Sequence, residues 1–254
     1  GITVSDRSYL QQYGYSDADR LESTITLERY KSDGLVKAEL AFYQSLLSDE
    51  STFTLPPVIA SVDTERSMAL AGGTVTFALD ADLHLRFGPD TGDDDRDVGR
   101  LGGAVDWTRS WVTDTGLVID TETGIQADVW TVSDDPVSTG GSRISPSATV
   151  SLRYPMIRTG QRAVDLVEPI LMVGWAGDYG DRMLNEDSIA AEFDEGNLFR
   201  LSRFPGDDLI EPGFQAAYGL SWYRSTPNGQ SARLIFGQVL RKEFAAFSDA
   251  SGLQ

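Results

Sequence analysis

The sequence predicts an all-β protein: an antiparallel up-and-down transmembrane β-barrel, of which this chain supplies a part with roughly nine to eleven strands. Two stretches carry the prediction, 74–87 and 214–223, because both alternate strictly between large apolar and small or polar residues. Successive strand residues point to opposite faces of a sheet, so each stretch has one apolar face and one wet face. At about 3.3 Å per residue, the first stretch is longer than most strands of globular proteins, which favours a barrel wall over a sandwich.

The polar face of 74–87 contains four ionisable residues, Asp80, Asp82, His84 and Arg86. Charged groups are costly to bury, so we expect these side chains to face a wet barrel lumen and the alternating apolar residues to face lipid. His84 is the single histidine of the chain. Histidine triads and multi-histidine metal sites need partners that the chain lacks, so we interpret His84 as a polar residue of the lumen.

From Arg20 onward the chain is predicted to form strand after strand, separated by turns and loops. Leu21–Lys31 and Leu35–Leu47 flank a turn at Ser32-Asp33-Gly34, and prolines interrupt the pattern at 55–58 because proline cannot donate to a ladder. Further strands are predicted at 103–112, 117–120, 125–132, 148–154, 161–175 and 232–241. Loops or turns are predicted at 90–96, 134–145 and 227–229, and one short helix at 188–199.

The composition excludes several classes of function. The net charge of −18 argues against a nucleic-acid partner, which needs a basic footprint. The chain has no cysteine, so disulfides, thiolate metal sites and cysteine nucleophiles are excluded from it. No run approaches the roughly 18 apolar residues of a spanning helix. The chain begins without methionine or a signal peptide, so we expect it to be a piece of a longer protein.

Two acidic groups are weighed as sites of chemistry. A glycosidase needs a pair of carboxylates, and candidates exist at Glu168, Glu186, Asp187, Glu192 and Asp194, but 39 acidic residues produce such pairs by chance. The cluster at 90–97 suggests calcium, but it lacks the glycine and terminal glutamate of an EF-hand loop. We therefore expect no catalytic residues, no cofactor and no metal site, with divalent ions between these carboxylates and anionic lipid as an open alternative.

The tryptophans support the membrane interpretation. In a barrel, aromatic residues near strand ends form girdles at the two membrane interfaces. Trp107, Trp111, Trp175 and Trp222 are expected at such positions. In a soluble sandwich the same residues would be core.

An ordered series of short motifs runs through the second half of the chain: Glu168-Pro169, Asn185-Glu186-Asp187-Ser188, Asn197-Leu198-Phe199, Arg203-Phe204-Pro205-Gly206-Asp207 and Tyr218-Gly219-Leu220. Matches on both sides continue it in register: Leu55-Pro56, Gly72-Gly73, Leu85-Arg86-Phe87-Gly88, Arg143 with Pro146, Gly237-Gln238 and Arg241. In this succession the chain resembles the LptD family (also called OstA), the outer-membrane lipopolysaccharide assembly proteins of Gram-negative bacteria. The residues of these motifs are most similar to those of alphaproteobacterial members.

The resemblance implies a periplasmic jellyroll followed by a very large barrel in the outer membrane. Lipopolysaccharide would arrive over a periplasmic bridge that includes LptA and leave through a lateral opening, and a lipoprotein, LptE, would plug the barrel. Residues 1–254 would then be a middle part of the C-terminal barrel, among outer-membrane lipids, without the jellyroll and without the gate strands. The implied structural positions are Glu168, Pro169, Asn185, Asp187, Ser188, Asn197, Leu198, Phe199, Arg203, Phe204, Gly206 and Asp207.

The long loop 177–210 is expected to be an ordered cap, since long structureless loops are uncommon in compact domains. We expect Asp187 or Ser188 to cap the short helix and Phe199 to pack back against the barrel mouth. Arg203 is expected to bond Asp207 or Asp208, with Glu168 as the alternative partner.

Two rival classes stay open from the residues alone. A porin or receptor barrel shares the alternation, and only the motif series opposes it. A soluble all-β carbohydrate-binding module or carbohydrate-active enzyme explains the alternation but not the length of 74–87.

Overall fold

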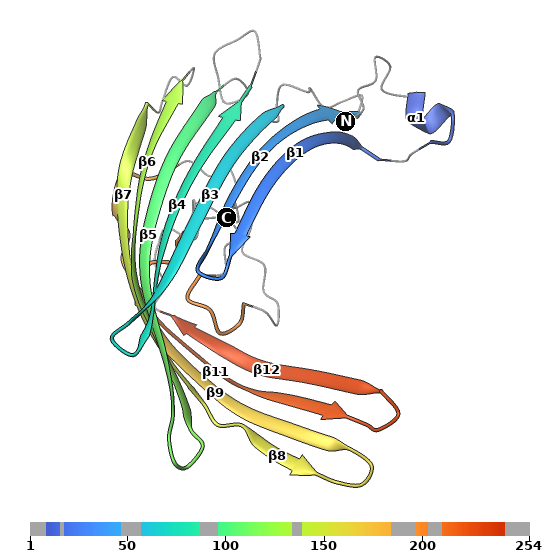
Figure 1. Cartoon of the computed structure of the whole chain (residues 1–254), viewed down its shortest axis with the longest axis vertical. Coiled ribbons are helices and arrows are strands. Elements are labelled where there is room, and N and C mark those ends of the chain that lie inside the picture. Colours follow the sequence, from blue (N-terminus) through green and yellow to red (C-terminus); the bar gives the residue numbers. More distant parts are fainter. Residues whose placement is uncertain are drawn as a thin grey trace. The chain divides into compact units, whose positions relative to one another are not determined.

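The computed structural model describes residues 9–15, 18–46, 57–86, 96–133, 139–183, 197–202 and 210–241. They form one antiparallel sheet of 12 strands, and the one helix among them is the short α1 (Tyr9–Gln12). Figure 1 shows strands that are consecutive in the chain lying side by side, in the order β1-β2-β3-β4-β5-β6-β7-β9-β11-β12. This up-and-down order confirms the predicted fold class, and within the described residues it does not return from β12 to β1.

The strands of this order are long, as a barrel wall requires. Their bounds are β1 (Arg20–Lys31), β2 (Gly34–Ser45), β3 (Val58–Leu70), β4 (Gly73–Leu85), β5 (Asp97–Val112), β6 (Val118–Ser133), β7 (Gly140–Arg153), β9 (Val164–Ala176), β11 (Gly213–Ser225) and β12 (Ser231–Arg241). Two short strands lie off the path: β8 (Met156–Thr159) pairs with β9, and β10 (Tyr179–Gly180) pairs with β7.

Several expected boundaries are wrong. The two strands expected at 117–120 and 125–132 are one strand, β6, which begins at Val118 and continues through the polar stretch between them. β7 begins at Gly140, so the expected loop 134–145 is shorter. β3 and α1 were not predicted. Of the expected helix 188–199, the described part 197–199 is a turn, and the rest lies outside the described residues.

The chain divides into two compact units. Unit 1 consists of Gly1–Met68, Thr76–Ala104 and Ala127–Arg143, and unit 2 consists of Ala69–Val75, Val105–Gln126 and Ile144–Gln254. In each unit the large apolar side chains of one face of the sheet are exposed. We call this the apolar face and the opposite one the polar face.

Register assigns the residues to these faces, because directly paired residues share a face. In unit 1, Ile25 pairs with Leu40, and both are exposed, Ile25 at 72%. In unit 2, Leu220 pairs with Phe236, and both are exposed. Other exposed apolar residues follow the same alternation: Leu27, Val36, Phe42, Val62, Phe77, Leu79, Leu83, Leu101, Ile125, Val129, Val150, Leu171, Val173, Phe214 and Leu240.

The polar face shows the opposite distribution of burial. Asp128 is 1% exposed, and His84, Arg86 and Arg143 are also buried. A water-soluble domain buries its apolar residues and leaves charged ones exposed. In unit 2, Ser145 and Gln215 are likewise buried on the polar face, each at 5% exposure. The sheet is therefore inverted relative to a soluble protein in both units.

Short turns alternate with longer connections along the chain. Ala71 and Gly72, with φ of 54° and 74°, make the turn between β3 and β4, and the turn between β11 and β12 contains Gly229 with φ of 80°. The turn between β1 and β2 is equally short, because Lys31 pairs with Gly34. The connections from β2 to β3, β4 to β5 and β9 to β11 are longer. Among the described residues no helix has the length and apolarity to cross a membrane.

Candidate functional site: the polar face of the sheet

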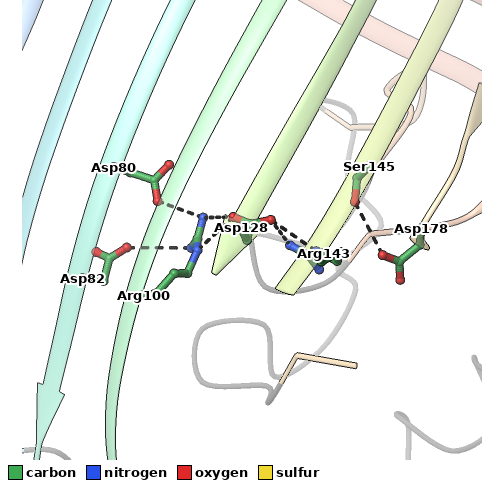
Figure 2. Close-up of polar contacts among 7 residues, drawn as sticks. All are labelled: Asp80, Asp82, Arg100, Asp128, Arg143, Ser145 and Asp178. Atoms are coloured by element: carbon green, nitrogen blue, oxygen red, sulfur yellow. Dashed lines mark hydrogen bonds and ion pairs between the residues drawn. The ribbon is translucent and has the colours of Figure 1, made fainter. Parts of the chain in front are cut away.

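The polar face of unit 1 carries a network of charged side chains from four neighbouring strands, shown in Figure 2. Asp128 of β6 lies at its centre. Arg100 of β5 donates from Nε to Asp128 Oδ1 at 3.2 Å, and Arg143 of β7 donates from Nη2 to Asp128 Oδ2 at 2.8 Å. Arg100 also pairs with Asp80 Oδ2 at 3.0 Å and with Asp82 Oδ2 at 3.8 Å, both on β4.

Asp128 is the carboxylate that both guanidiniums of this network share. Three carboxylates face two guanidiniums, and both oxygens of Asp128 accept charge-assisted bonds, which are stronger than neutral ones. The Asp80 carboxylate lies over Gly102 of β5, where a Cβ would be 2.7 Å from Asp80 Cγ. A glycine at this position therefore gives Asp80 the room to reach Arg100.

The other two lumen candidates lie at the end of β4. Arg86 Nη1 donates to the Arg96 carbonyl at 2.6 Å, and the Arg86 amide donates to Asp97 Oδ1 at 2.8 Å, which joins the end of β4 to the start of β5. His84 is 7% exposed on the same face. All four candidates thus share the polar face of β4, and two of them enter the network around Arg100.

The polar face of unit 2 has separate ion pairs. Arg153 of β7 donates to Asp120 Oδ2 at 2.9 Å and to Glu168 Oε1 at 3.2 Å, so it joins residues from β6 and β9. Arg241 at the end of β12 donates to Glu211 Oε2 at 2.7 Å. The predicted alternative partner for Glu168 was Arg203, which lies outside the described residues; the partner observed is Arg153.

The same face has a groove of small residues on β9, β11 and β12, and residues 197–202 fill it. A Cβ at Gly174 would lie 2.7 Å from Leu201 Cδ1, and one at Gly237 would lie 2.7 Å from Leu198 Cδ2. Phe199 Cζ lies 2.8 Å from the Cβ position of Gly219. Below the segment, Ala217 is 0% exposed. Apolar side chains therefore pack directly on the strand backbone.

The segment is also anchored by polar contacts. Gln215 Nε2 donates to the Leu201 carbonyl, and the Arg200 amide donates to the Asn197 carbonyl at 3.0 Å. Phe199 was expected to pack against the barrel mouth; in the structure it lies against Gly219 on the polar face of β11, and its position relative to a barrel mouth stays a prediction. Pro169 is on the apolar face of β9, and its carbonyl accepts from the Tyr154 amide at 3.1 Å. Outside the described residues lie Asn185, Asp187, Ser188, Arg203, Phe204, Gly206, Asp207 and Asp208, and with them the predicted helix cap and local ion pair.

The polar face of unit 2 also has an open depression of about 510 Å³. The side chains of this face that line it are mainly hydroxyls and carboxylates: Thr74, Thr108, Ser110, Asp120, Glu122, Thr149 and Ser151. Within the described ranges, no three histidine, cysteine, aspartate or glutamate residues gather as a metal site. The polar faces therefore offer hydrated surface and ion pairs.

At the turn between β1 and β2, Asp33 forms an ion pair with Arg66 of β3. Arg66 Nη2 donates to Asp33 Oδ2 at 2.8 Å. This hydrogen bond, together with the positive charge of Arg66, holds the pKa of Asp33 below its usual value.

Comparison with known families identifies the chain. The family model described as LptD, LPS transport system D, matches residues 3–245. The chain belongs to this family. No curated protein matches it. The LptD assignment predicted from the motif series is confirmed, while the alphaproteobacterial origin stays a prediction.

LptD membership supports an outer-membrane component of lipopolysaccharide transport, and the inverted antiparallel sheet agrees with the wall of a β-barrel. The motif series led to the family and included Arg143, but it did not lead to the other residues that organise the polar face, Arg100, Asp120, Asp128 and Arg153. One sequence signal could have found some of them: Asp128 and Arg153 are charged residues inside alternating strands. Their partners could not be read, because cross-strand contacts depend on register.

Proposed function

We propose that this LptD chain is part of the wall of an outer-membrane barrel that inserts lipopolysaccharide into the outer leaflet. It catalyses no reaction and needs no cofactor. The observation that carries the proposal is the inversion of the two faces in a chain of the lipopolysaccharide transport family. Exposed apolar residues on long strands fit contact with lipid, and buried ion pairs on the other face fit a wet lumen.

The polar face suits lipid headgroups and a protein plug. Ion pairs, hydroxyls and the open depression give a hydrated surface over which polar headgroups can move. An LptE-like lipoprotein in the lumen and an LptA-like periplasmic bridge are the partners that family membership supports. The net charge of −18 is unfavourable for anionic lipopolysaccharide, so basic positions elsewhere or divalent cations would have to compensate.

The loop motifs have a structural role in this proposal. Residues 197–202, which include Asn197, Leu198 and Phe199, hold a cap on the polar face. The other motif residues of this loop, Asn185, Asp187, Ser188, Arg203, Phe204, Gly206 and Asp207, lie outside the described residues. Glu168 ties β9 to β7 through Arg153.

The strand order from β1 to β12 is not closed within the described residues, which supports the proposal that the chain forms part of a barrel wall with β1 and β12 as its edges. Unpaired edges promote aggregation and cannot face lipid. The isolated 254-residue chain is therefore expected to aggregate in plain buffer. A monomeric species that unfolds cooperatively there would contradict the partial-barrel proposal.

The function is tested by depleting the full-length protein in its own cells. Newly made lipopolysaccharide should then fail to reach the cell surface, while unrelated outer-membrane barrels still assemble at first. Complementation with the full-length gene should restore surface lipopolysaccharide. Normal surface lipopolysaccharide with lost uptake of small solutes would instead support a porin or receptor, and recovery of the protein in the soluble fraction would support a carbohydrate-binding module.

A further inference from the structure

The apolar face of unit 2 carries tryptophan and arginine side chains together beside the short turns. On β5, Trp107 Nε1 donates to the Leu70 carbonyl at 3.1 Å, and Arg109 Nη1 donates to the Ala71 carbonyl at 3.1 Å. The Arg109 guanidinium carbon lies 4.7 Å from the centroid of Trp111. These contacts fix the aromatic rings and the cation next to the turn between β3 and β4.

The end of β11 repeats this arrangement. Arg224 Nε donates to Asp165 Oδ1 at 2.7 Å, and its guanidinium carbon lies 5.3 Å from the Trp222 ring. Trp222 Nε1 donates to the same carboxylate oxygen at 3.2 Å. Arg158 of β8 pairs in register with Asp165, so it shares this face, and it is exposed. Arg224 thus bonds to Asp165, and Arg158 lies opposite the same residue in the neighbouring strand.

The opposite ends of the strands differ. Beside the long connection from β9 to β11, the apolar face has Trp175 against Phe214, with ring centroids 6.3 Å apart. Among the described residues of unit 2, the half of the apolar face next to that connection has no lysine or arginine. Unit 1 follows the same rule by itself: Arg29 pairs with Val36 on the apolar face, and Arg29, Lys31 and Arg66 all lie close to the turn at 32–33.

We propose that this basic–aromatic band, made by Trp107, Arg109, Trp111, Arg158, Trp222 and Arg224, binds the phosphate headgroups of anionic glycerophospholipids. The proposal rests on the proposed function, since it needs a barrel in a membrane. Arginine matches phosphate with two parallel donors, and tryptophan prefers the level of the headgroups.

Topology selects glycerophospholipid over lipopolysaccharide as the occupant. Outer-membrane barrels have short turns on the periplasmic side and longer loops outside. The band lies at the short-turn ends, so it contacts the periplasmic leaflet.

Sidedness is tested in cells with the full-length protein. An epitope tag at Asn228, in the turn between β11 and β12, should stay hidden on intact cells and become detectable after permeabilisation. The same tag at Asp181, in the long connection, should be detected on intact cells. A tag at Asn228 that antibodies reach on intact cells would overturn the assignment, because the band would then contact lipopolysaccharide.

Lipid preference is tested with the purified full-length protein in vesicles containing brominated phosphatidylglycerol or brominated phosphatidylcholine, which quench nearby tryptophans. Quenching should show a preference for phosphatidylglycerol. The variant R109Q/R158Q should lower this preference by at least about five-fold, the effect expected for one basic residue near an anionic surface. The control R162Q/R233Q removes two charges from the same end, in a turn and on the polar face, and should keep the preference.

Each other outcome is decisive. Equal quenching by both lipids in the unchanged protein would overturn the proposed lipid binding by the band. An equal loss of the preference for phosphatidylglycerol in both variants would also overturn it. Failure of the proposed function has a different signature: no quenching by either lipid, because the protein would not enter the bilayer.

Discussion

The polar faces of the two units are filled in different ways. In unit 1, β4 to β7 fill their polar face with their own long side chains, which pair around Asp128. In unit 2, β9 to β12 carry small residues there, and the segment 197–202 supplies the bulk. The first arrangement depends on charge balance and the second on shape. The polar face of a barrel wall can therefore be filled by the side chains of its own strands or by a separate segment that packs on it.

Removing the Asp128 carboxylate from the centre of the unit 1 network should have the largest effect on stability. Asp128→Ala leaves Arg100 and Arg143 without their shared carboxylate in a buried site, which costs about 3–5 kcal/mol. The measurement is the urea concentration at which half of the full-length protein in lipid is unfolded. The folded fraction is read from the folded band on unheated gels. Asp82→Ala is the control: its contact with Arg100 is 3.8 Å and its side chain is 24% exposed, so a loss below about 1 kcal/mol is expected. Equal losses of stability in the two variants would show that Asp128 is not the residue on which the network depends.

Releasing the inner layer of unit 2 should have an intermediate effect. Leu198→Ala with Phe199→Ala removes the side chains that contact Gly237 and Gly219, so the segment should open more often. Trypsin cleavage after the exposed Arg200 should rise by about ten-fold, which corresponds to about 1.4 kcal/mol. The matched control is Leu234→Ala with Phe236→Ala, which removes the same two side-chain types from the apolar face of β12.

That control should leave cleavage after Arg200 unchanged, because its side chains lie on the other face of the sheet. Rapid cleavage of the unchanged protein after Arg200 would show that the segment 197–202 does not stay packed on the sheet.

The glycine beneath Asp80 should give the smallest effect. Gly102→Ala places a methyl group against the Asp80 carboxylate and weakens its pairing with Arg100, at a cost of about 1 kcal/mol. The neighbouring Gly103→Ala points to the apolar face, where its nearest contact is the flexible Leu79 side chain at 3.1 Å, and should be nearly neutral. In an Asp80→Ala background the cost at Gly102 should vanish. A cost that persists there would show that backbone crowding, not Asp80, is responsible.

The sequence predicted those parts of the fold that depend on alternation along one strand. β4 and β11 were correct to within two residues, because large apolar and polar residues alternate without interruption. β3 was missed, since its alanines and serines give little contrast between faces. β6 was divided because its middle is polar on both faces.

The candidate site was less predictable. The polar face of β4 follows from its own alternation, but the partners of Asp80 lie on other strands, and register is not visible in one sequence. The small face of β11 was recognised, whereas the segment that fills it comes from a loop whose path the local pattern does not fix. The pairing of Glu168 with Arg153 joins strands on either side of a short hairpin, and the sequence alone offered several possible partners.

The central claim is that the apolar face contacts lipid and the polar face contacts water. It is tested most directly by two adjacent substitutions on β11 of the full-length protein, Leu220→Arg and Ser221→Arg. Leu220 pairs with Phe236 on the apolar face, and Ser221 pairs with Glu168 and Ile235 on the polar face. In lipid bilayers, Leu220→Arg should lower the free energy of unfolding by about 2–4 kcal/mol near the midplane, and Ser221→Arg by far less. Equal losses at the two positions, or a larger loss at Ser221, would contradict the assignment of the faces.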